Sequence, residues 1–207
     1  WSIRQIMDFL LDLDQSLFVF LNSLGSISYD KVWLYISEKD TWIWLYLFSL
    51  ILLLTGKREN FIQIGFSYYD IKPTYRNTFS FLLVLILLIT FTDQSSNLFK
   101  DYFQRLRPCH DPNLIDLFRV VKESCGGLYS FFSAHAANSF AFATFIFFMT
   151  QKCYRKLSFV LFIWALIVSY SRIYIGVHFP LDIIFGAVYG ISSGYIFYSL
   201  LKYITKN

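Results

Sequence analysis

The stretch from Ser171 to Asp182 holds an arginine, a histidine and an aspartate between two long apolar runs: Arg172, His178 and Asp182. Ionisable residues at the edge of a membrane span are costly, so they indicate a functional site. A carboxylate beside a histidine can fix its tautomer and stabilise its charged form. A nearby cation suits an anionic substrate. The stretch therefore predicts an activated histidine that faces a phosphate, although His178 and Asp182 could also pair for structural reasons alone.

A glycine and a proline interrupt the same stretch at Gly176 and Pro180. Glycine commonly follows the last turn of a helix, and proline favours the first turn of the next. We therefore expect His178 on a tight turn and Asp182 in the first turn of a new helix.

A second polar stretch, KDYFQRLRP, runs from Lys100 to Pro108. Lys100 and Arg107 are seven residues apart, which places them on one helix face to within about 20°. Pro108 either ends this helix or disfavours helix at Arg107. Asp93 lies seven residues before Lys100 and is a candidate partner for it. The alternative is a cluster of basic side chains that snorkel to the membrane–water interface without a role in catalysis.

A third polar stretch, at Phe131 to His135, opens another apolar run. The free N–H groups of a helix start favour an anion, so Ser133 and Ala134 are candidate phosphate contacts. His135 could protonate a leaving oxygen. The alternative is a serine cap followed by an incidental histidine.

A metal site could be built from two histidines and the aspartate, namely His135, His178 and Asp182. The three cations of the polar stretches would repel a metal ion and attract an oxyanion, so we expect no metal and no cofactor. His110 has no comparable surroundings and is expected to be non-catalytic.

The composition favours a membrane protein. Of the 207 residues, 56% are hydrophobic and only 15% are charged, against about 25% charged in soluble domains. The apolar runs predict an all-α, polytopic membrane bundle with about five spans. The expected spans are 41–55, 78–98, 131–150, 157–174 and 181–201. Three glycines at every fourth position of the last span predict close helix packing: Gly186, Gly190 and Gly194.

The N-terminal segment, residues 1–40, is expected to form amphipathic helices in the membrane interface, with an irregular short span as the alternative. Apolar residues recur there at helical spacing: Ile3, Ile6, Met7, Leu10 and Leu13. Residues 41–207 are predicted to form one transmembrane domain with a catalytic core at about 78–201. The segment 61–75 is expected to be a loop packed against the membrane face.

Five spans place all three polar stretches on the same side of the membrane. The opposite side carries nine basic residues: Lys57, Arg58, Lys72, Arg76, Lys152, Arg155, Lys156, Lys202 and Lys206. The positive-inside rule makes that side cytoplasmic. We therefore expect a multi-pass protein of a bacterial inner membrane whose site faces the periplasm or exterior.

Two cysteines, Cys109 and Cys125, fall in one external loop, and Cys153 falls on the cytoplasmic side. Disulfides persist in oxidising compartments. We predict a Cys109–Cys125 bridge, worth about 3 kcal/mol in the chain-entropy model, and a free Cys153. Two unpaired thiols are the alternative.

The three stretches together resemble the type 2 phosphatidic acid phosphatase (PAP2) family, whose fold is shared with vanadium haloperoxidases. The family pattern is K-x6-RP, then PSGH, then SR-x5-H-x3-D. The chain reads KDYFQRLRP, FSAH and SRIYIGVHFPLD, so the first and third motifs match in full. In the second motif Phe132 replaces proline and Ala134 replaces glycine. The resemblance covers residues 78 to 201.

The resemblance implies a metal-independent lipid phosphatase that acts through a phosphohistidine. His178 would attack phosphorus, Asp182 would orient it and His135 would serve as acid and base. The phosphate would be held by three cations and the start of a helix: Lys100, Arg107, Arg172, Ser133 and Ala134.

The substrates that fit are phosphatidic acid, phosphatidylglycerol phosphate, undecaprenyl diphosphate and lipid A 1-phosphate. Partners are then the lipid phosphate and the bilayer, with no nucleic acid and no obligate protein partner expected. A non-hydrolytic lipid-phosphate binding or transport protein is the main alternative. A haloperoxidase is disfavoured because those enzymes are usually soluble.

Overall fold

The computed structural model describes residues 2–47, 75–114, 116–122 and 124–206, without the side chains of 75–78, 151–158 and 206. Within these ranges the chain is helical, and the only extended pairing is an isolated bridge between Leu106 and Tyr129. The elements are α1 (Ile3–Ser23), η1 (Ile27–Tyr29), α2 (Asp30–Ser37), η2 (Asp40–Trp42), α4 (Tyr75–Phe103), η3 (Pro108–His110), α5 (Ala134–Tyr174) and α6 (Pro180–Lys206). The predicted all-α class is confirmed.

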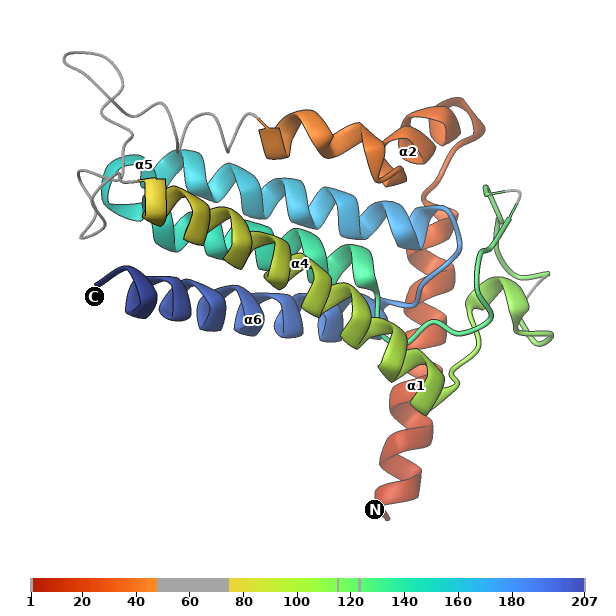
Figure 1. Cartoon of the computed structure of the whole chain (residues 1–207). Helices are drawn as coiled ribbons and strands as arrows, with labels where there is room; N and C mark the ends of the chain where they lie inside the picture. The colour runs from red at the N-terminus through yellow and green to blue at the C-terminus, as the bar shows by residue number, and fades with distance from the viewer. Residues whose placement is uncertain (1, 48–74, 115, 123, 207) are drawn as a thin grey trace.

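Helix α5 folds back on itself as two antiparallel arms, which Figure 1 shows as a hairpin beside α4 and α6. The rings of Phe142 and Trp164 are 6.1 Å apart, whereas a straight helix would separate residues at that spacing by about 33 Å. The two apolar arms are Ala134–Thr150 and Phe159–Tyr174. They match the third and fourth predicted spans.

The outer surface of the bundle is apolar. Phe79–Phe103 in α4 and Pro180–Thr205 in α6 are long and apolar enough to cross a bilayer. Large apolar side chains on α4, α5 and α6 point outward, among them Ile86, Ile163 and Val188. Water would penalise so continuous an apolar surface, whereas lipid accepts it. The predicted polytopic membrane bundle is therefore confirmed, although its first span, 41–55, lies largely outside the described residues.

The glycines of α6 form a packing seam against the first arm of α5, as predicted. A Cβ atom at Gly190 would lie 2.3 Å from the carbonyl oxygen of Ala137, and one at Gly194 would lie 2.5 Å from that of Ala141. Real Cβ atoms do not approach backbone oxygen so closely. The two helix backbones therefore touch because these side chains are absent.

Helix α1 crosses one end of the bundle at a steep angle to the other helices (Figure 1). Its buried residues are Asp14, Phe18 and Asn22, whereas the predicted apolar face is exposed, with Ile3 at 81% and Met7 at 57%. The helical periodicity was correctly predicted, but the protein contacts a different, largely polar face. Its placement in the membrane interface stays a prediction, as do the domain boundaries.

Asn22 shows how that polar face is used. Its side-chain nitrogen donates to the carbonyls of Ile173, Tyr174 and Arg119, and its oxygen accepts the N–H of Arg119. The last carbonyls of a helix have no partner within the helix. Asn22 therefore caps the end of α5 from another helix and fixes the chain just before the predicted active-site turn.

Two further predictions concern residues or side chains that the structure does not describe. The segment 61–75 falls on undescribed residues, except for the start of α4, and the side chain of Cys153 is not described.

Replacing Gly190 by alanine should destabilise the protein, because the new Cβ meets a backbone oxygen that cannot move aside. Overpacking of this kind costs about 1–3 kcal/mol, equivalent to a fall in Tm of roughly 2–12 °C for a chain of this size. Thermal unfolding in detergent measures the change. Gly127→Ala is the matched control, since nothing lies within 4 Å of its added Cβ. Equal Tm values for the two variants would contradict a tight seam.

Candidate active site

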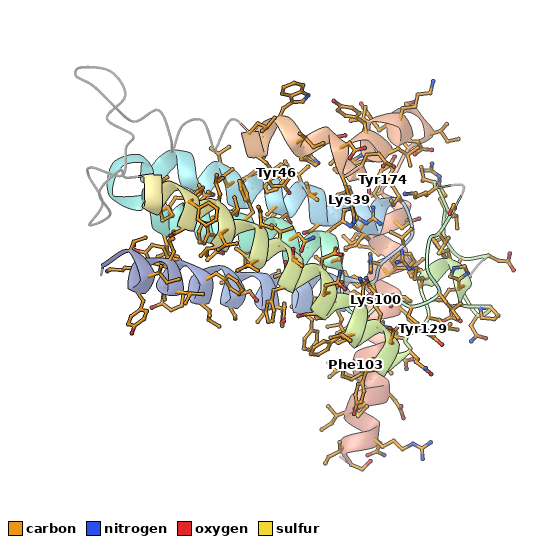
Figure 2. All side chains as sticks on the ribbon, in the orientation of Figure 1. Lys39, Tyr46, Lys100, Phe103, Tyr129 and Tyr174 are labelled. Carbon is orange, nitrogen blue, oxygen red and sulfur yellow. A yellow bond between two sulfur atoms is a disulfide. The ribbon has the colours of Figure 1, made fainter. Side chains whose placement is uncertain are left out.

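The three polar stretches meet at one end of the bundle. The C-terminal end of α4, both ends of α5 and the start of α6 all lie at the end that α1 crosses (Figures 1 and 2). Segments far apart in sequence thus come together, because each long helix delivers one polar end to the same region.

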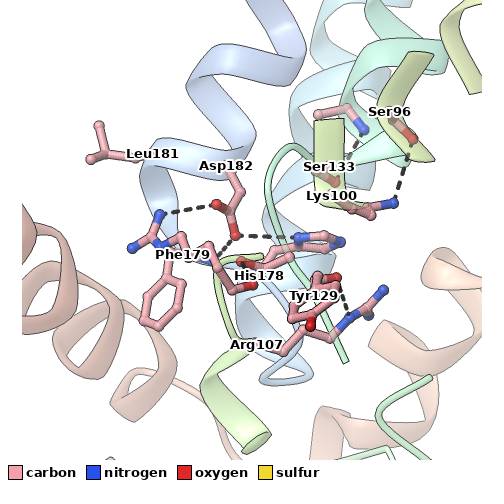
Figure 3. A network of polar contacts seen from close by, with 12 residues as sticks. Ser96, Lys100, Arg107, Tyr129, Ser133, His178, Phe179, Leu181 and Asp182 are labelled. Atoms are coloured by element: carbon pink, nitrogen blue, oxygen red, sulfur yellow. Dashed lines mark hydrogen bonds and ion pairs between the residues drawn. The ribbon is translucent and has the colours of Figure 1, made fainter. Parts of the chain in front are cut away.

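The turn between α5 and α6 carries the predicted nucleophile. Gly176 adopts a φ of +83°, and a Cβ there would lie 2.8 Å from the ring of Phe118. His178 follows on the turn and α6 begins at Pro180, as predicted. Nδ1 of His178 lies 3.4 Å from Oδ2 of Asp182 (Figure 3).

Burial lowers the pKa of His178 well below its ordinary value. Three cations lower this pKa further: Arg107, Arg172 and Lys100, while the backbone of Ser130 opposes them. The imidazole is therefore neutral at physiological pH and keeps a free lone pair. That all three cations act on this ring shows that the structure gathers them around it.

Arg107 reaches the site differently from the expectation. We expected Lys100 and Arg107 to share one helix face, but α4 ends at Phe103. Gln104 then takes a left-handed φ of 48°, and the chain leaves the helix before Arg107. The expected shared helix face was wrong because α4 ends four residues before Arg107. The alternative expectation, that Pro108 disfavours helix at Arg107, is confirmed by the extended backbone of Arg107.

Arg107 is held instead by the external loop. Its Nε donates to the carbonyl of Tyr129 at 3.1 Å (Figure 3), and its Nη1 donates to that of Cys125 at 2.9 Å. The predicted disulfide between Cys109 and Cys125 is present, with Cα atoms 6.4 Å apart. The bridge closes the loop beside the Arg107 guanidinium, so it supports the position of this cation.

Arg172 is buried and forms no salt bridge with an acidic side chain in the part of the chain that the structure describes. It is 5% exposed, and its Nη1 donates to the hydroxyl and carbonyl oxygens of Ser37 at the end of α2. Its Nε has no hydrogen-bond partner among the described residues. A buried guanidinium with an unused donor is suited to binding an anion.

Lys100 donates to the hydroxyl of Ser96 at 3.4 Å (Figure 3). Asp93, expected as a candidate partner of Lys100, attracts the Lys100 ammonium electrostatically without a direct bond to it. Its direct contacts are Nζ of Lys39 at 4.0 Å and a 3.4 Å hydrogen bond accepted from Asn138. The Lys100 ammonium is therefore left without a directly bonded carboxylate in the described part of the chain.

Ser133 caps α5, and its Oγ accepts from the N–H of Ala136 at 3.5 Å. Its own N–H donates to the carbonyl of Asp182 at 3.1 Å. This bond ties the start of α5 to the start of α6. The free N–H of Ala134 and the imidazole of His135 then follow in the first turn of α5.

His135 opens onto a cavity of about 450 Å³ on the side of α4 and α5. Its other lining residues are Lys39, Trp42, Tyr46, Leu85, Ile89, Thr90, Asp93, Gln94, Asn138, Phe142, Trp164 and Val168. The cavity has aromatic and aliphatic walls with a few polar groups. It can accommodate an amphiphilic group next to the imidazole.

Three residues near the site were not predicted from the sequence. Arg105 forms salt bridges with Asp182 at 3.0 Å and with Asp14 at 2.5 Å, and Ser37 binds Arg172. Arg105 lies between Lys100 and Arg107, so its charge was a usable signal. Asp14 and Ser37 gave none, because only the fold brings them here. Within the described residues no group of three or more His, Cys, Asp or Glu side chains is placed to hold a metal.

Comparison with known proteins identifies the family of the chain. The family model described as "PAP2 superfamily" matches residues 78–206. A lipid A 4'-phosphatase of Porphyromonas gingivalis is 34% identical over 95% of this chain and 76% of its own length. A lipid A 4'-phosphatase of Bacteroides thetaiotaomicron is 33% identical over 97% of this chain and 82% of its own.

Two solved structures share the fold. The crystal structure of Aquifex aeolicus LpxE has a TM-score of 0.61 and 25% identity, covering 89% of this chain and 93% of its own. The crystal structure of a transmembrane PAP2-type phosphatidylglycerolphosphate phosphatase from Bacillus subtilis has a TM-score of 0.66 and 19% identity, covering 94% of this chain and 87% of its own. The chain therefore belongs to the PAP2 superfamily, and it is a membrane lipid phosphatase that hydrolyses phosphoric monoesters.

Proposed function

We propose that the protein removes the 4'-phosphate of lipid A through a phosphohistidine intermediate on His178. The observation that carries the chemistry is the buried pair of His178 and Asp182 surrounded by three cations. The observation that carries the substrate is the similarity to two lipid A 4'-phosphatases over at least 95% of the chain. The four substrates expected from the sequence included the 1-phosphate of lipid A, and the relatives favour the 4' position.

The substrate phosphate binds between Lys100, Arg107 and Arg172. Arg172 offers its unused Nε, and the hydroxyl of Ser133 and the N–H of Ala134 supply further donors at the start of α5. These groups neutralise charge on the equatorial oxygens in the transition state. They are positioned before the substrate arrives, because the loop, α2 and the helix ends hold them.

His178 attacks phosphorus with Nε2, because its Nδ1 faces Asp182. The new N–P bond forms as the ester P–O bond breaks, and His135 gives its proton to the leaving oxygen. Asp182 accepts the Nδ1–H and stabilises the positive charge on the phosphorylated ring. A water then attacks phosphorus while His135 takes its proton, the N–P bond breaks, and phosphate and neutral His178 are released.

The cavity beside His135 binds the leaving group, which is the part of the lipid that departs with the ester oxygen. Trp42, Tyr46 and Trp164 give it aromatic walls, and Asp93 and Asn138 give it polar groups. The indole N–H of Trp164 is buried and has no hydrogen-bond partner among the described residues. Aromatic faces with a few hydrogen-bonding groups suit a hydroxylated sugar that carries acyl chains.

The site is proposed to face the periplasm from a bacterial inner membrane. The nine basic residues opposite the polar stretches support this orientation through the positive-inside rule. A periplasmic site also agrees with the Cys109–Cys125 disulfide, because disulfides persist in oxidising compartments.

His178→Ala should reduce phosphate release to background, because no other described group can take the covalent role. His135→Ala should lower kcat by about 100-fold or more, the usual contribution of a general acid–base. Phosphate release from purified protein in detergent measures both. His110→Ala is the control and should keep near wild-type activity. Turnover close to wild type in His178→Ala would overturn the phosphohistidine scheme.

A substrate panel tests the proposed specificity. The protein is incubated with bisphosphorylated lipid A, phosphatidic acid, phosphatidylglycerol phosphate and undecaprenyl diphosphate, and mass spectrometry locates the phosphate that is lost. We expect loss from the 4' position of lipid A, unchanged by excess EDTA and inhibited by vanadate, which mimics five-coordinate phosphorus. Preferential hydrolysis of another lipid, or of the 1-phosphate of lipid A, would refute the proposal that the 4'-phosphate of lipid A is the substrate. Loss of activity in EDTA would refute metal independence.

The proposed orientation predicts a cytoplasmic C-terminus. A green fluorescent protein fused after Asn207 should therefore fluoresce, whereas alkaline phosphatase fused at the same point should be inactive. The reverse pattern in the two fusions would place the site on the cytoplasmic side.

A further inference from the structure

Asp14 is a buried carboxylate on α1, a helix whose apolar face is largely exposed. It is 3% exposed, and burial raises the pKa of its carboxyl while Arg105 and the Leu181 N–H lower it. Its Oδ2 lies 2.5 Å from Nη2 of Arg105, and its Oδ1 accepts the N–H of Leu181 at 2.8 Å. A carboxylate so buried is costly unless it is fully paired, and both oxygens of Asp14 are used.

Arg105 connects Asp14 to the active site. Its Nη1 lies 3.0 Å from Oδ1 of Asp182, while its Nη2 binds Asp14. Its guanidinium carbon lies 4.1 Å from the centroid of the Phe179 ring, which fixes the plane of the group. Only a planar fork can hold two carboxylates in a fixed relation, so lysine could not replace it.

These contacts determine how Asp182 faces His178. Arg105 occupies Oδ1 of Asp182, so Oδ2 is left for the N–H of Phe179 at 3.0 Å and for Nδ1 of His178 at 3.4 Å (Figure 3). Asp14 also binds a free N–H at the first turn of α6, the turn that carries Asp182. The helix and its aspartate are thus held from the same point on α1.

We propose that Asp14 and Arg105 are positioning residues for the Asp182–His178 pair, and that helix α1 thereby completes the catalytic centre. The inference rests on the proposed role of His178 as the nucleophile. Neither residue contacts the phosphate-binding cations in the described structure. Their effect should therefore fall on the rate of the chemical step and not on substrate binding.

The test is steady-state kinetics of Asp14→Asn, Arg105→Lys and the double variant. Asp14→Asn keeps the shape but loses the charge, and Arg105→Lys keeps the charge but loses the fork. Each should lower kcat by about 10- to 100-fold, the usual result of misplacing a reacting group, with KM changed less than about threefold. The double variant should lose less than the product of the two single losses, because both residues act on the orientation of the same carboxylate, Asp182.

Asp30→Asn is the matched control. Asp30 forms a 2.6 Å ion pair with Arg119, and its other oxygen accepts the hydroxyl of Tyr174 at 2.8 Å. None of its contacts in the described part of the chain reaches Asp182, so its loss should leave kcat near wild type. If Asp14→Asn fails to fold, Arg105→Lys decides the question, and a wild-type kcat in it would overturn the proposal. Multiplying effects in the double variant, or a rise in KM alone, would also overturn it. An active His178→Ala would instead refute the proposed function itself.

Discussion

The fully buried carboxylate of Asp182 is the constraint on which the rest of the site depends. A charge at the end of a membrane helix is tolerated only when every acceptor is satisfied. Asp182 meets this demand with partners from three other parts of the chain: Arg105, the Phe179–His178 turn and, through its backbone carbonyl, Ser133. Satisfying one buried carboxylate thus draws together the ends of α4, α5 and α6.

The cations around His178, unlike the carboxylate of Asp182, are not fully paired. Asp182 is paired with Arg105, which it shares with Asp14. In the described part of the chain, by contrast, Arg172 keeps an Nε donor without a partner, and Lys100 hydrogen-bonds to the hydroxyl of Ser96. Leaving positive charge unpaired costs stability, and the cost is recovered when a phosphate binds. Burial, together with the same field, lowers the pKa of His178 and keeps its ring neutral in the free enzyme. A bound phosphate offsets that field, which favours the positive charge that develops on the ring.

The elements outside the helical core hold these groups in place. The external loop fixes Arg107 through its backbone carbonyls and is itself closed by the disulfide. Helix α2 supplies Ser37 to Arg172. Helix α1 caps the end of α5 with Asn22 and reaches Arg105 with Asp14. The N-terminal segment, which carries no family motif, therefore supplies contacts that hold the site together.

The amino-acid sequence alone was sufficient to predict the fold class, four of the spans, the glycine seam, the turn at Gly176 and the disulfide. The spans, the seam and the turn follow from apolar run length and backbone preference within short stretches of sequence. The disulfide follows from the order of the spans, which places both cysteines in one loop. The three-dimensional arrangement was needed to show how Arg107 reaches the site and which residues hold Asp182. The sequence spacing favoured a helix face for Arg107, but α4 ends at Phe103 and the loop carries it instead. The role of Asp14 could not be predicted, because an ion pair between residues 91 positions apart produces no periodic pattern in the sequence.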